Sequence, residues 1–312
     1  MMRVLCLYTV ILLGSCGWNA NRAKQEYLAQ GNALYEKGNY AEAELAYRKA
    51  TQKDPKFAEA YFRLGLAQIK RGDFPRAVRS LQRAGQLDPA HTESQVALGD
   101  IFLSAYIGDG SRPKPILDQL LTIVSKLKTK SPDTYDTLRL SGYLALVQGN
   151  RQEALRFLRG ANVAKPMQAS LVLTICQNLM LENDGAAAEK LALQLMAAQK
   201  DYGDIYDFLY LYYRSAKRVP EAEAILDAKV ANNPKVSGYR VQLAAHYASI
   251  GRGTDTGMTL RTLIDNPADF PGARIDVGDY YLRTQNWTEA IRQYEEGLLL
   301  EPKNKLLYQT RI

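Results

Sequence analysis

A 34-residue unit, Ala58 to His91, is restated along most of the chain. Apolar residues in its first half recur at steps of three and four, as on one face of an amphipathic helix. Gly72 ends this helix and Asp73 caps a second one, because glycine accepts the left-handed conformation and aspartate accepts hydrogen bonds from a first helical turn. The unit is therefore predicted to be a helix hairpin whose apolar side needs a neighbouring unit to cover it.

The spacing of small and large residues in this unit is specific. Positions 4, 7, 8, 15, 17, 20, 24, 27 and 32 carry Tyr61, Leu64, Gly65, Gly72, Phe74, Ala77, Leu81, Ala84 and Pro89. This pattern resembles the tetratricopeptide repeat. The resemblance implies an all-α fold, a right-handed superhelical solenoid of stacked antiparallel helix hairpins.

The register of the unit divides most of the chain into eight repeats. They are predicted at residues 24–57, 58–91, 92–134, 135–168, 169–202, 203–236, 237–270 and 271–304. Repeat three holds nine extra residues near 106–114, where turn formers predict a loop between its helices, either neutral or in contact with a partner. Residues 305–312 would begin a truncated ninth repeat, which indicates that the sequence is part of a longer array.

The N-terminus has the pattern of a secretory signal. Arg3 precedes an apolar run over residues 4–13, which is too short for a stable membrane span. The next residues, Leu-Gly-Ser-Cys at 13–16, resemble the bacterial lipobox, so residues 1–15 are predicted to be a lipoprotein signal peptide and residues 16–23 the lipidated Cys16 with a short tether. A non-lipidated signal cut near Ala20 is the alternative.

The resemblance to lipoproteins also implies a location. Gly17 follows the lipidated cysteine, where an aspartate would retain a lipoprotein at the inner membrane. We therefore expect an extracytoplasmic, lipid-anchored protein, with the periplasmic face of the outer membrane favoured. Nucleic acid is not expected as a partner outside the cytoplasm.

Patterns of catalytic or metal-binding residues are scarce. The two histidines, His91 and His246, have no metal-ligand spacing, and the glycines follow the repeat rather than a phosphate-binding loop. Cys176 lacks a paired base and occupies position 8 of its unit, which predicts a packing role. The sequence therefore predicts no enzyme, no cofactor and no metal site.

The resemblance implies that positions 2, 5, 6, 9, 12 and 13 of each first helix line a concave, partner-binding groove. The groove candidates are Asn32, Tyr35, Phe62, Arg63, Leu66, Arg139, Tyr143, Asp207, Phe208 and Leu211. This mixture of apolar, aromatic and charged groups suits an extended segment or an amphipathic helix of a protein partner.

One known activity of such repeats, the binding of a C-terminal carboxylate, is excluded by the residues at the required positions. Repeats that grip a C-terminal carboxylate carry lysine, arginine and asparagine at five groove positions. Here those positions hold Leu28, Asn32, Arg63, Glu93 and Ala97. Only Asn32 matches, so that clamp is absent.

The net charge of +7 is spread along the chain rather than concentrated. A solvated outer face is the simplest interpretation, although it would also suit anionic lipid or an anionic polysaccharide. We therefore predict a noncatalytic, membrane-anchored scaffold that binds protein partners in the cell envelope. Two alternatives remain open, a component of an exopolysaccharide export or envelope assembly machine and a direct binder of anionic glycan.

Overall fold

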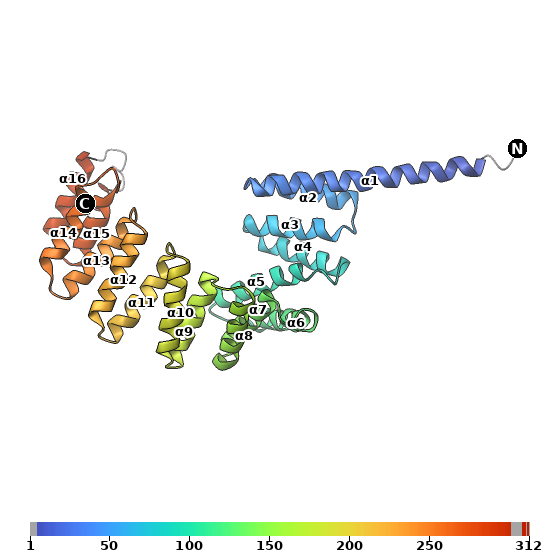
Figure 1. Cartoon of the computed structure of the whole chain (residues 1–312). Coiled ribbons are helices and arrows are strands. Elements are labelled where there is room, and N and C mark those ends of the chain that lie inside the picture. Colours follow the sequence, from blue (N-terminus) through green and yellow to red (C-terminus); the bar gives the residue numbers. More distant parts are fainter. Residues whose placement is uncertain (1–4, 301–307, 310, 312) are drawn as a thin grey trace. The chain divides into compact units, whose positions relative to one another are not determined.

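The computed structural model describes residues 5–300, 308, 309 and 311, with side chains from residue 21 onward. Within these residues the chain forms 16 α-helices and no strand, which confirms the predicted all-α fold (Figure 1). The helices belong to two compact units, Met1–Pro166 and Met167–Ile312.

The first unit consists of four consecutive helix hairpins, and each helix packs on the next along the chain. Its helices are α1 (Leu5–Glu36), α2 (Tyr40–Lys53), α3 (Ala58–Lys70), α4 (Phe74–Leu87), α5 (Thr92–Gly108), α6 (Lys114–Lys130), α7 (Tyr135–Val147) and α8 (Arg151–Ala164). Helices α3, α5 and α7 begin at residues 58, 92 and 135, where the register places the start of repeats two, three and four.

The second unit continues the same hairpin pattern with four more pairs. Its helices are α9 (Ala169–Leu181), α10 (Gly185–Ala198), α11 (Gly203–Ser215), α12 (Val219–Asn232), α13 (Ser237–Ser249), α14 (Gly253–Ile264), α15 (Ala273–Arg283) and α16 (Trp287–Leu300). The first helices also contact one another, α9 with α11 and α13 with α15, so they form a layer.

Complementary side-chain volumes hold the two helices of each hairpin together. A methyl group on Gly31, at position 8, would lie only 2.4 Å from the ring of Tyr47 at position 24. Pairs at the same two positions are Gly65 with Leu81, Gly142 with Leu158 and Gly278 with Tyr294. In repeat five the larger Cys176 stands at position 8 and the small Ala192 at position 24, both fully buried. In these five repeats one of the two residues is small, which allows the helices to pack closely.

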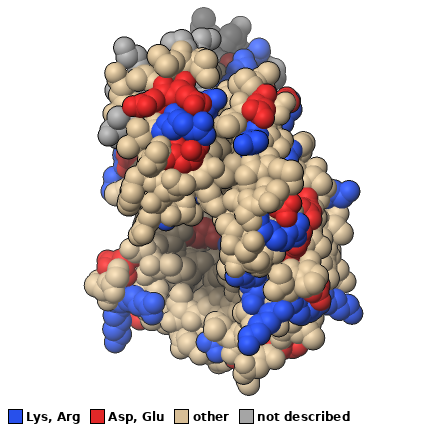
Figure 2. All heavy atoms as spheres, turned by 90° about the vertical axis from the view of Figure 1, so that its left-hand side faces the viewer, with Lys and Arg blue, Asp and Glu red and all other residues tan. Residues whose placement is uncertain are grey.

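An ion pair between consecutive repeats recurs at the outer edge of the hairpins. A glutamate at position 21 of one repeat meets an arginine near the turn of the next repeat. The pairs are Glu44 with Arg71, Glu189 with Arg218 at 3.1 Å and Glu223 with Arg252 at 2.7 Å. On the face shown in Figure 2, basic and acidic groups accordingly lie next to one another in mixed patches.

The insertion in repeat three lengthens helices, which corrects the predicted loop over 106–114. Helices α5 and α6 contain 17 residues each, against 13 in α3 and 14 in α4. Four and three of the extra residues therefore lie in the two helices, and only two lengthen the turn. Tyr106, in the added part of α5, is buried, and its burial favours continuing the helix there. The turn formers Asp109 to Pro113 form the turn between α5 and α6.

Helix α1 is continuous from Leu5 to Glu36 and includes residues 16–23, so the stretch expected to be a short tether is helical. The side chain of Cys16 lies outside the described residues, and its lipidation stays a prediction. None of the helices that the structure describes combines the length and apolar character needed to cross a membrane.

The expected start of a ninth repeat, residues 305–312, falls mostly outside the described residues. Tyr308 is described and is fully buried against Gly297 of α16. Gly297, at position 27 of repeat eight, therefore contacts the ring of Tyr308, which stands at position 4 of the expected next unit.

Candidate functional site

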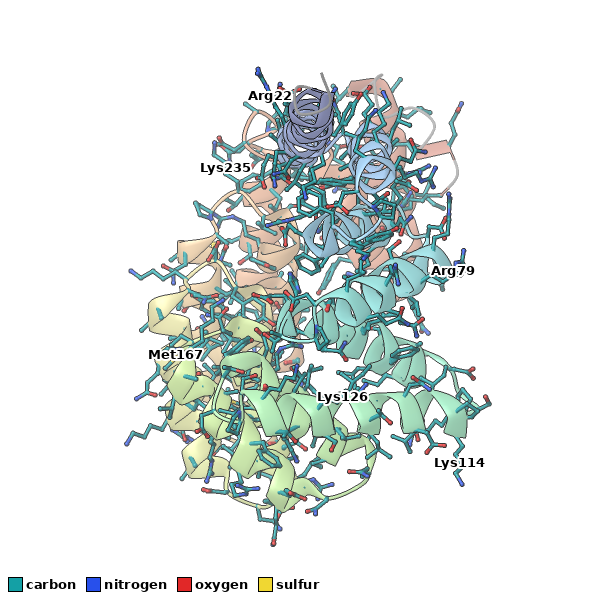
Figure 3. The ribbon with its side chains drawn as sticks, turned by 90° about the vertical axis from the view of Figure 1, so that its right-hand side faces the viewer. Arg22, Arg79, Lys114, Lys126, Met167 and Lys235 are labelled. Carbon is teal, nitrogen blue, oxygen red and sulfur yellow. The ribbon has the colours of Figure 1, made fainter. Side chains whose placement is uncertain are left out.

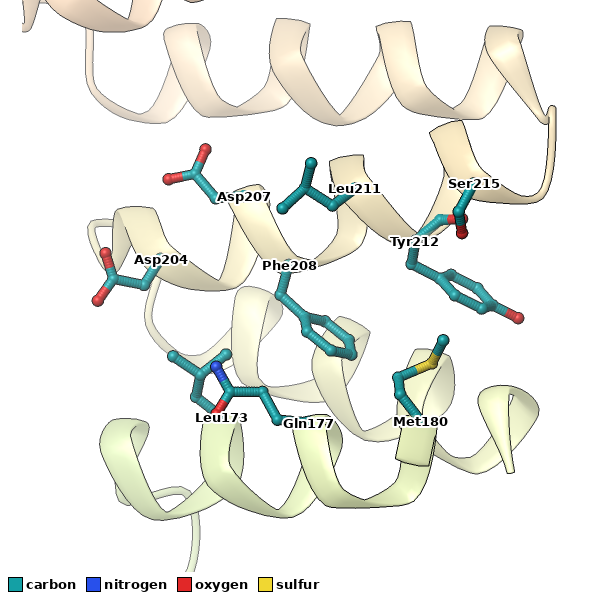
Figure 4. Close-up of a pocket in the computed structure, with 9 residues that line it drawn as sticks. All are labelled: Leu173, Gln177, Met180, Asp204, Asp207, Phe208, Leu211, Tyr212 and Ser215. Carbon is teal, nitrogen blue, oxygen red and sulfur yellow. The ribbon is translucent and has the colours of Figure 1, made fainter. Parts of the chain in front are cut away.

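A cleft in the second unit lies between the first helices of repeats five and six. Its volume is about 620 Å³. The lining residues are Leu173, Gln177, Met180, Asp204, Asp207, Phe208, Leu211, Tyr212 and Ser215. All of them except Tyr212 occupy position 2, 5, 6, 9, 12 or 13 of their repeat, the positions that the resemblance assigned to the groove (Figure 4).

Helix α11 places these side chains in the cleft by burying its opposite face. Its buried residues are Ile205, Tyr206, Leu209 and Tyr213. Because these residues already fill the core, Leu211 and Phe208 are left on the other face, and Leu211 is 64% exposed. The exposed apolar surface formed by Leu211 and Phe208, called the apolar floor below, favours binding an apolar segment of another molecule. Such a contact would remove both apolar surfaces from water.

The polar end of this cleft is organised by a buried lysine. Lys229 of α12 is 2% exposed, and its Nζ donates to Asp207 Oδ1 at 2.7 Å and to Gln242 Oε1 at 2.9 Å. Gln242 Nε2 donates to the same Asp207 oxygen at 2.6 Å, and the ammonium lies 4.1 Å from the centre of the Tyr239 ring. A buried ammonium needs such partners, so Asp207 is held in one orientation at the cleft wall.

A second cleft, in the first unit, has a volume of about 350 Å³. The residues that line it are Phe62, Leu66, Thr92, Glu93, Val96, Ala97, Asp100, Ser131, Thr134, Asp136 and Thr137. Two of its three acidic groups, Asp100 and Asp136, share one arginine within the protein. Arg139 Nη1 donates to Asp100 Oδ1 at 2.7 Å and Arg139 Nη2 to Asp136 Oδ1 at 3.3 Å, while His91 Nδ1 lies 3.4 Å from Glu93 Oε2.

Five of the predicted groove residues line the two clefts. Phe62 and Leu66 line the cleft of the first unit. Asp207, Phe208 and Leu211 line the cleft of the second. Phe62 is only 9% exposed and also belongs to the hydrophobic core of its unit.

The other predicted groove residues serve contacts within the first unit. Asn32 Oδ1 accepts a hydrogen bond from the Tyr47 hydroxyl at 2.9 Å, and Arg63 pairs with Glu59 at 2.6 Å. Three further contacts complete the set, Tyr35 against the Tyr40 ring, Arg139 with its two aspartates and Tyr143 against the core. Their binding role stays a prediction.

Six lining residues of the larger cleft were missed by the list of candidates drawn from the sequence. They are Leu173, Gln177, Met180, Asp204, Tyr212 and Ser215. The first three occupy positions 5, 9 and 12 of repeat five, so the register itself carried the signal. Lys229 also carried one, since position 27 holds alanine in repeats one, two and four.

The reactive side chain that lies outside the clefts, the thiol of Cys176, is packed in the core. Cys176 is fully buried, its Sγ lies 3.5 Å from the Ala188 carbonyl oxygen, and burial raises the pKa of its thiol to about 12. The Cys176 thiol is therefore protonated near neutral pH and unsuited to nucleophilic attack. Among the described residues, no group of three or more His, Cys, Asp or Glu is placed to hold a metal ion.

His246 is buried on α13 in the second unit. Tyr210 Oη and Arg214 Nη1 each lie 3.4 Å from its Nδ1, and its Nε2 has no hydrogen-bond partner among the described residues. Burial lowers the pKa of His246, and the positive charge of Arg214 lowers it further. The ring is therefore held neutral at physiological pH, as a packed group.

Several exposed basic residues of the first unit lie on the second helices of its hairpins. Arg79 and Arg83 on α4 and Lys126 and Lys130 on α6 are exposed. Figure 3 shows Arg79 on α4, and Lys114 and Lys126 along α6. This distribution is that of a solvated outer face.

The sequence and the fold together define the class of protein, an all-helical repeat protein with open clefts on its first-helix layer. Two family models match, one described as TPR repeat over residues 31–72 and one described as tetratricopeptide repeat over residues 58–91. These matches show tetratricopeptide repeats over residues 31–91, and proteins with such repeats generally bind protein partners and have a non-catalytic fold. None of the curated proteins matches the sequence.

Solved structures of similar fold include other repeat proteins. Pseudomonas aeruginosa PilF is 14% identical, with a TM-score of 0.52 over 73% of this chain and 96% of that one. PilW, described as a type IV pilus biogenesis factor, is 14% identical, with a TM-score of 0.51 over 67% of this chain and 93% of that one. At this identity the likeness shows the fold alone.

Proposed function

We propose that the chain is a noncatalytic scaffold that binds segments of partner proteins in the clefts of its first-helix layer, principally in the cleft between repeats five and six. The observation that carries the proposal is the apolar floor of this cleft, where Leu211 is 64% exposed beside Phe208, Leu173 and Met180. Its volume of about 620 Å³ suits a few side chains of a bound segment.

Photocrosslinking from inside the cleft tests this proposal. A benzoylphenylalanine replaces Tyr212, which lines the cleft, and in a matched control it replaces Met258, which is 56% exposed on α14 outside it. In cells that express the full chain we expect protein adducts at position 212 that are absent at 258. A second change, Leu211→Asp, should remove them, because a charge on the apolar floor would have to be desolvated by the ligand. Adducts that persist in this variant would place the binding surface elsewhere.

The same proposal includes a lipid anchor at Cys16 and a location in the cell envelope. Its support is the sequence at residues 13–16 after a basic residue and an apolar run. Confinement to a membrane would raise the effective concentration at which modest cleft contacts act. Cys16→Ser should abolish incorporation of labelled fatty acid and release the chain from the membrane fraction. Unchanged labelling would refute the anchor without touching the cleft. The narrower roles in polysaccharide export and in glycan binding stay predictions.

A further inference from the structure

The cleft of the second unit is charged at one end and apolar along the rest. Two aspartates and no lysine or arginine are found among its lining residues. Figure 4 shows Asp204 and Asp207 together at one end, the Phe208 ring in the middle, and Met180 and Tyr212 toward the other end. A ligand that fills this cleft therefore meets carboxylates at one end only.

The carboxylates at this end are incompletely neutralised. Lys229 and Gln242 both donate to Oδ1 of Asp207, and Oδ2 accepts no hydrogen bond from the described residues. Asp204 is exposed and likewise has none in the part of the chain that the structure describes. With Lys229 counted, Asp204 and Asp207 leave one net negative charge, and the buried lysine cannot turn outward to neutralise it.

Resting on the proposed function, we infer that this cleft selects an apolar protein segment that carries one lysine or arginine, seated at Asp204 and the free oxygen of Asp207. A cationic side chain is the group that complements one net negative charge, whereas an acidic segment would meet repulsion there. The partial shelter of the cleft strengthens this preference relative to open water.

The spacing along α11 sets the spacing expected in the ligand. Asp204 and Leu211 are seven residues apart on one helix, which corresponds to about 10 Å at 1.5 Å per residue. An extended segment covers that span in about three residues. The expected ligand therefore has a basic residue about three positions from a leucine, phenylalanine or methionine.

Selection of nonapeptides from a phage-displayed random library on the full chain tests the inference. We expect selected peptides to share a lysine or arginine about three residues from a large apolar residue, and Leu211→Asp to abolish their binding. The best synthetic nonapeptide should lose about fivefold in affinity with Asp204→Asn, a loss that added salt also produces. Asp201→Asn, which removes an exposed charge outside the cleft lining, is the matched control and should leave the affinity unchanged.

A double-mutant cycle connects the two charges. Replacement of the peptide's basic residue by glutamine should cost about as much as Asp204→Asn, and the two changes together should cost little more than either alone. Peptides that bind in the cleft without a basic residue, or that keep their affinity for the Asp204→Asn chain, would overturn the charge preference and leave the proposed function standing. Failure to select any peptide that Leu211→Asp weakens would overturn both.

Discussion

Both clefts are lined mainly by groove positions of first helices, yet they offer different surfaces to a ligand. In the first unit, Arg139 pairs with both Asp100 and Asp136, and the aromatic residue of the wall, Phe62, is part of the core. In the second unit, the wall residue Leu211 is largely exposed and Asp204 has no internal cation among the described residues. The repeat register therefore fixes where a cleft forms, and the pairing of a few charges decides what it can bind.

The largest expected difference concerns the two aromatic wall residues. Phe62→Ala should lower the free energy of unfolding of the first unit by about 3 kcal/mol, because it removes a nearly buried side chain from the core. Phe208→Ala should cost markedly less, since Phe208 is only partly buried. Urea unfolding followed by hydrogen exchange resolved to each unit would measure both. Equal decreases in the free energy of unfolding would show that Phe208 contributes as much to the stability of its unit as Phe62 does.

The next difference lies in the buried ion pair under the second cleft. Asp207→Ala should destabilise the second unit by about 3 kcal/mol, because it leaves the Lys229 ammonium buried with only Gln242 as a polar partner. Lys229→Met, which keeps the length and removes the charge, should cost less than about 1 kcal/mol. The same exchange experiment compares the two variants. A larger cost for Lys229→Met would show that the ammonium stabilises the fold rather than merely orienting Asp207.

A smaller difference should appear in the response of the two units to acid. Burial and Arg214 lower the pKa of His246, with Glu223, Arg252 and Asp227 as its other charged neighbours, so the unfolded second unit takes up a proton before the folded one does. The contribution of neutral His246 to the stability of the second unit should be complete above about pH 6.5, the pKa of free histidine. It should be lost as the pH falls toward the lowered pKa of the folded state.

The first unit supplies the comparison for this titration. Burial alone would raise the pKa of Glu44, but hydrogen bonds from Arg71 and Gln68 outweigh it, so the folded pKa is lowered. Its contribution is full above the unfolded pKa, near 4.5, and is lost only as the pH falls through the still lower folded pKa. As the pH falls from 7 to 5.5, protection of the backbone amides should weaken first in the second unit. Hydrogen exchange measures this protection once the rates are corrected for the intrinsic effect of pH. His246→Gln should remove that early loss, and an unchanged early loss would exclude His246 as its source.

The smallest expected effect is on the affinity of the first cleft for basic peptides, which one substitution should bring closer to that of the second cleft. Arg139→Gln should free Asp100 and Asp136 and give the first cleft about threefold greater affinity for basic peptides, measured in a chain whose second cleft is blocked by Leu211→Asp. Arg79→Gln removes a charge of the same sign from an exposed position on α4 that does not line this cleft, and it is the control. No gain over this control would show that internal pairing does not set the charge preference.

Much of the fold could be predicted because its signals are local. The periodicity of Ala58 to His91 predicted helix hairpins, and the same register led to Phe208 and Leu211 in a cleft. The loop predicted over 106–114 is confined to residues 109–113 because turn residues indicate where a helix can end, whereas buried residues such as Tyr106 decide how far it continues. Lys229 was overlooked because its partners, Asp207 and Gln242, come from different helices, and sequence spacing does not reveal that they meet.

The sequence by itself determined the repeat and the hairpins, because these depend on helix periodicity and on residues within one 34-residue unit. The positions expected to face a groove followed from the family resemblance that this unit carries. Only the tertiary structure decided that Arg139 pairs with two carboxylates of one cleft, while Asp204 of the other has no cation partner among the described residues. The physical reason is that such pairing depends on distances of a few ångströms between side chains of different repeats. The Coulomb energy of those contacts is set in space and not along the chain.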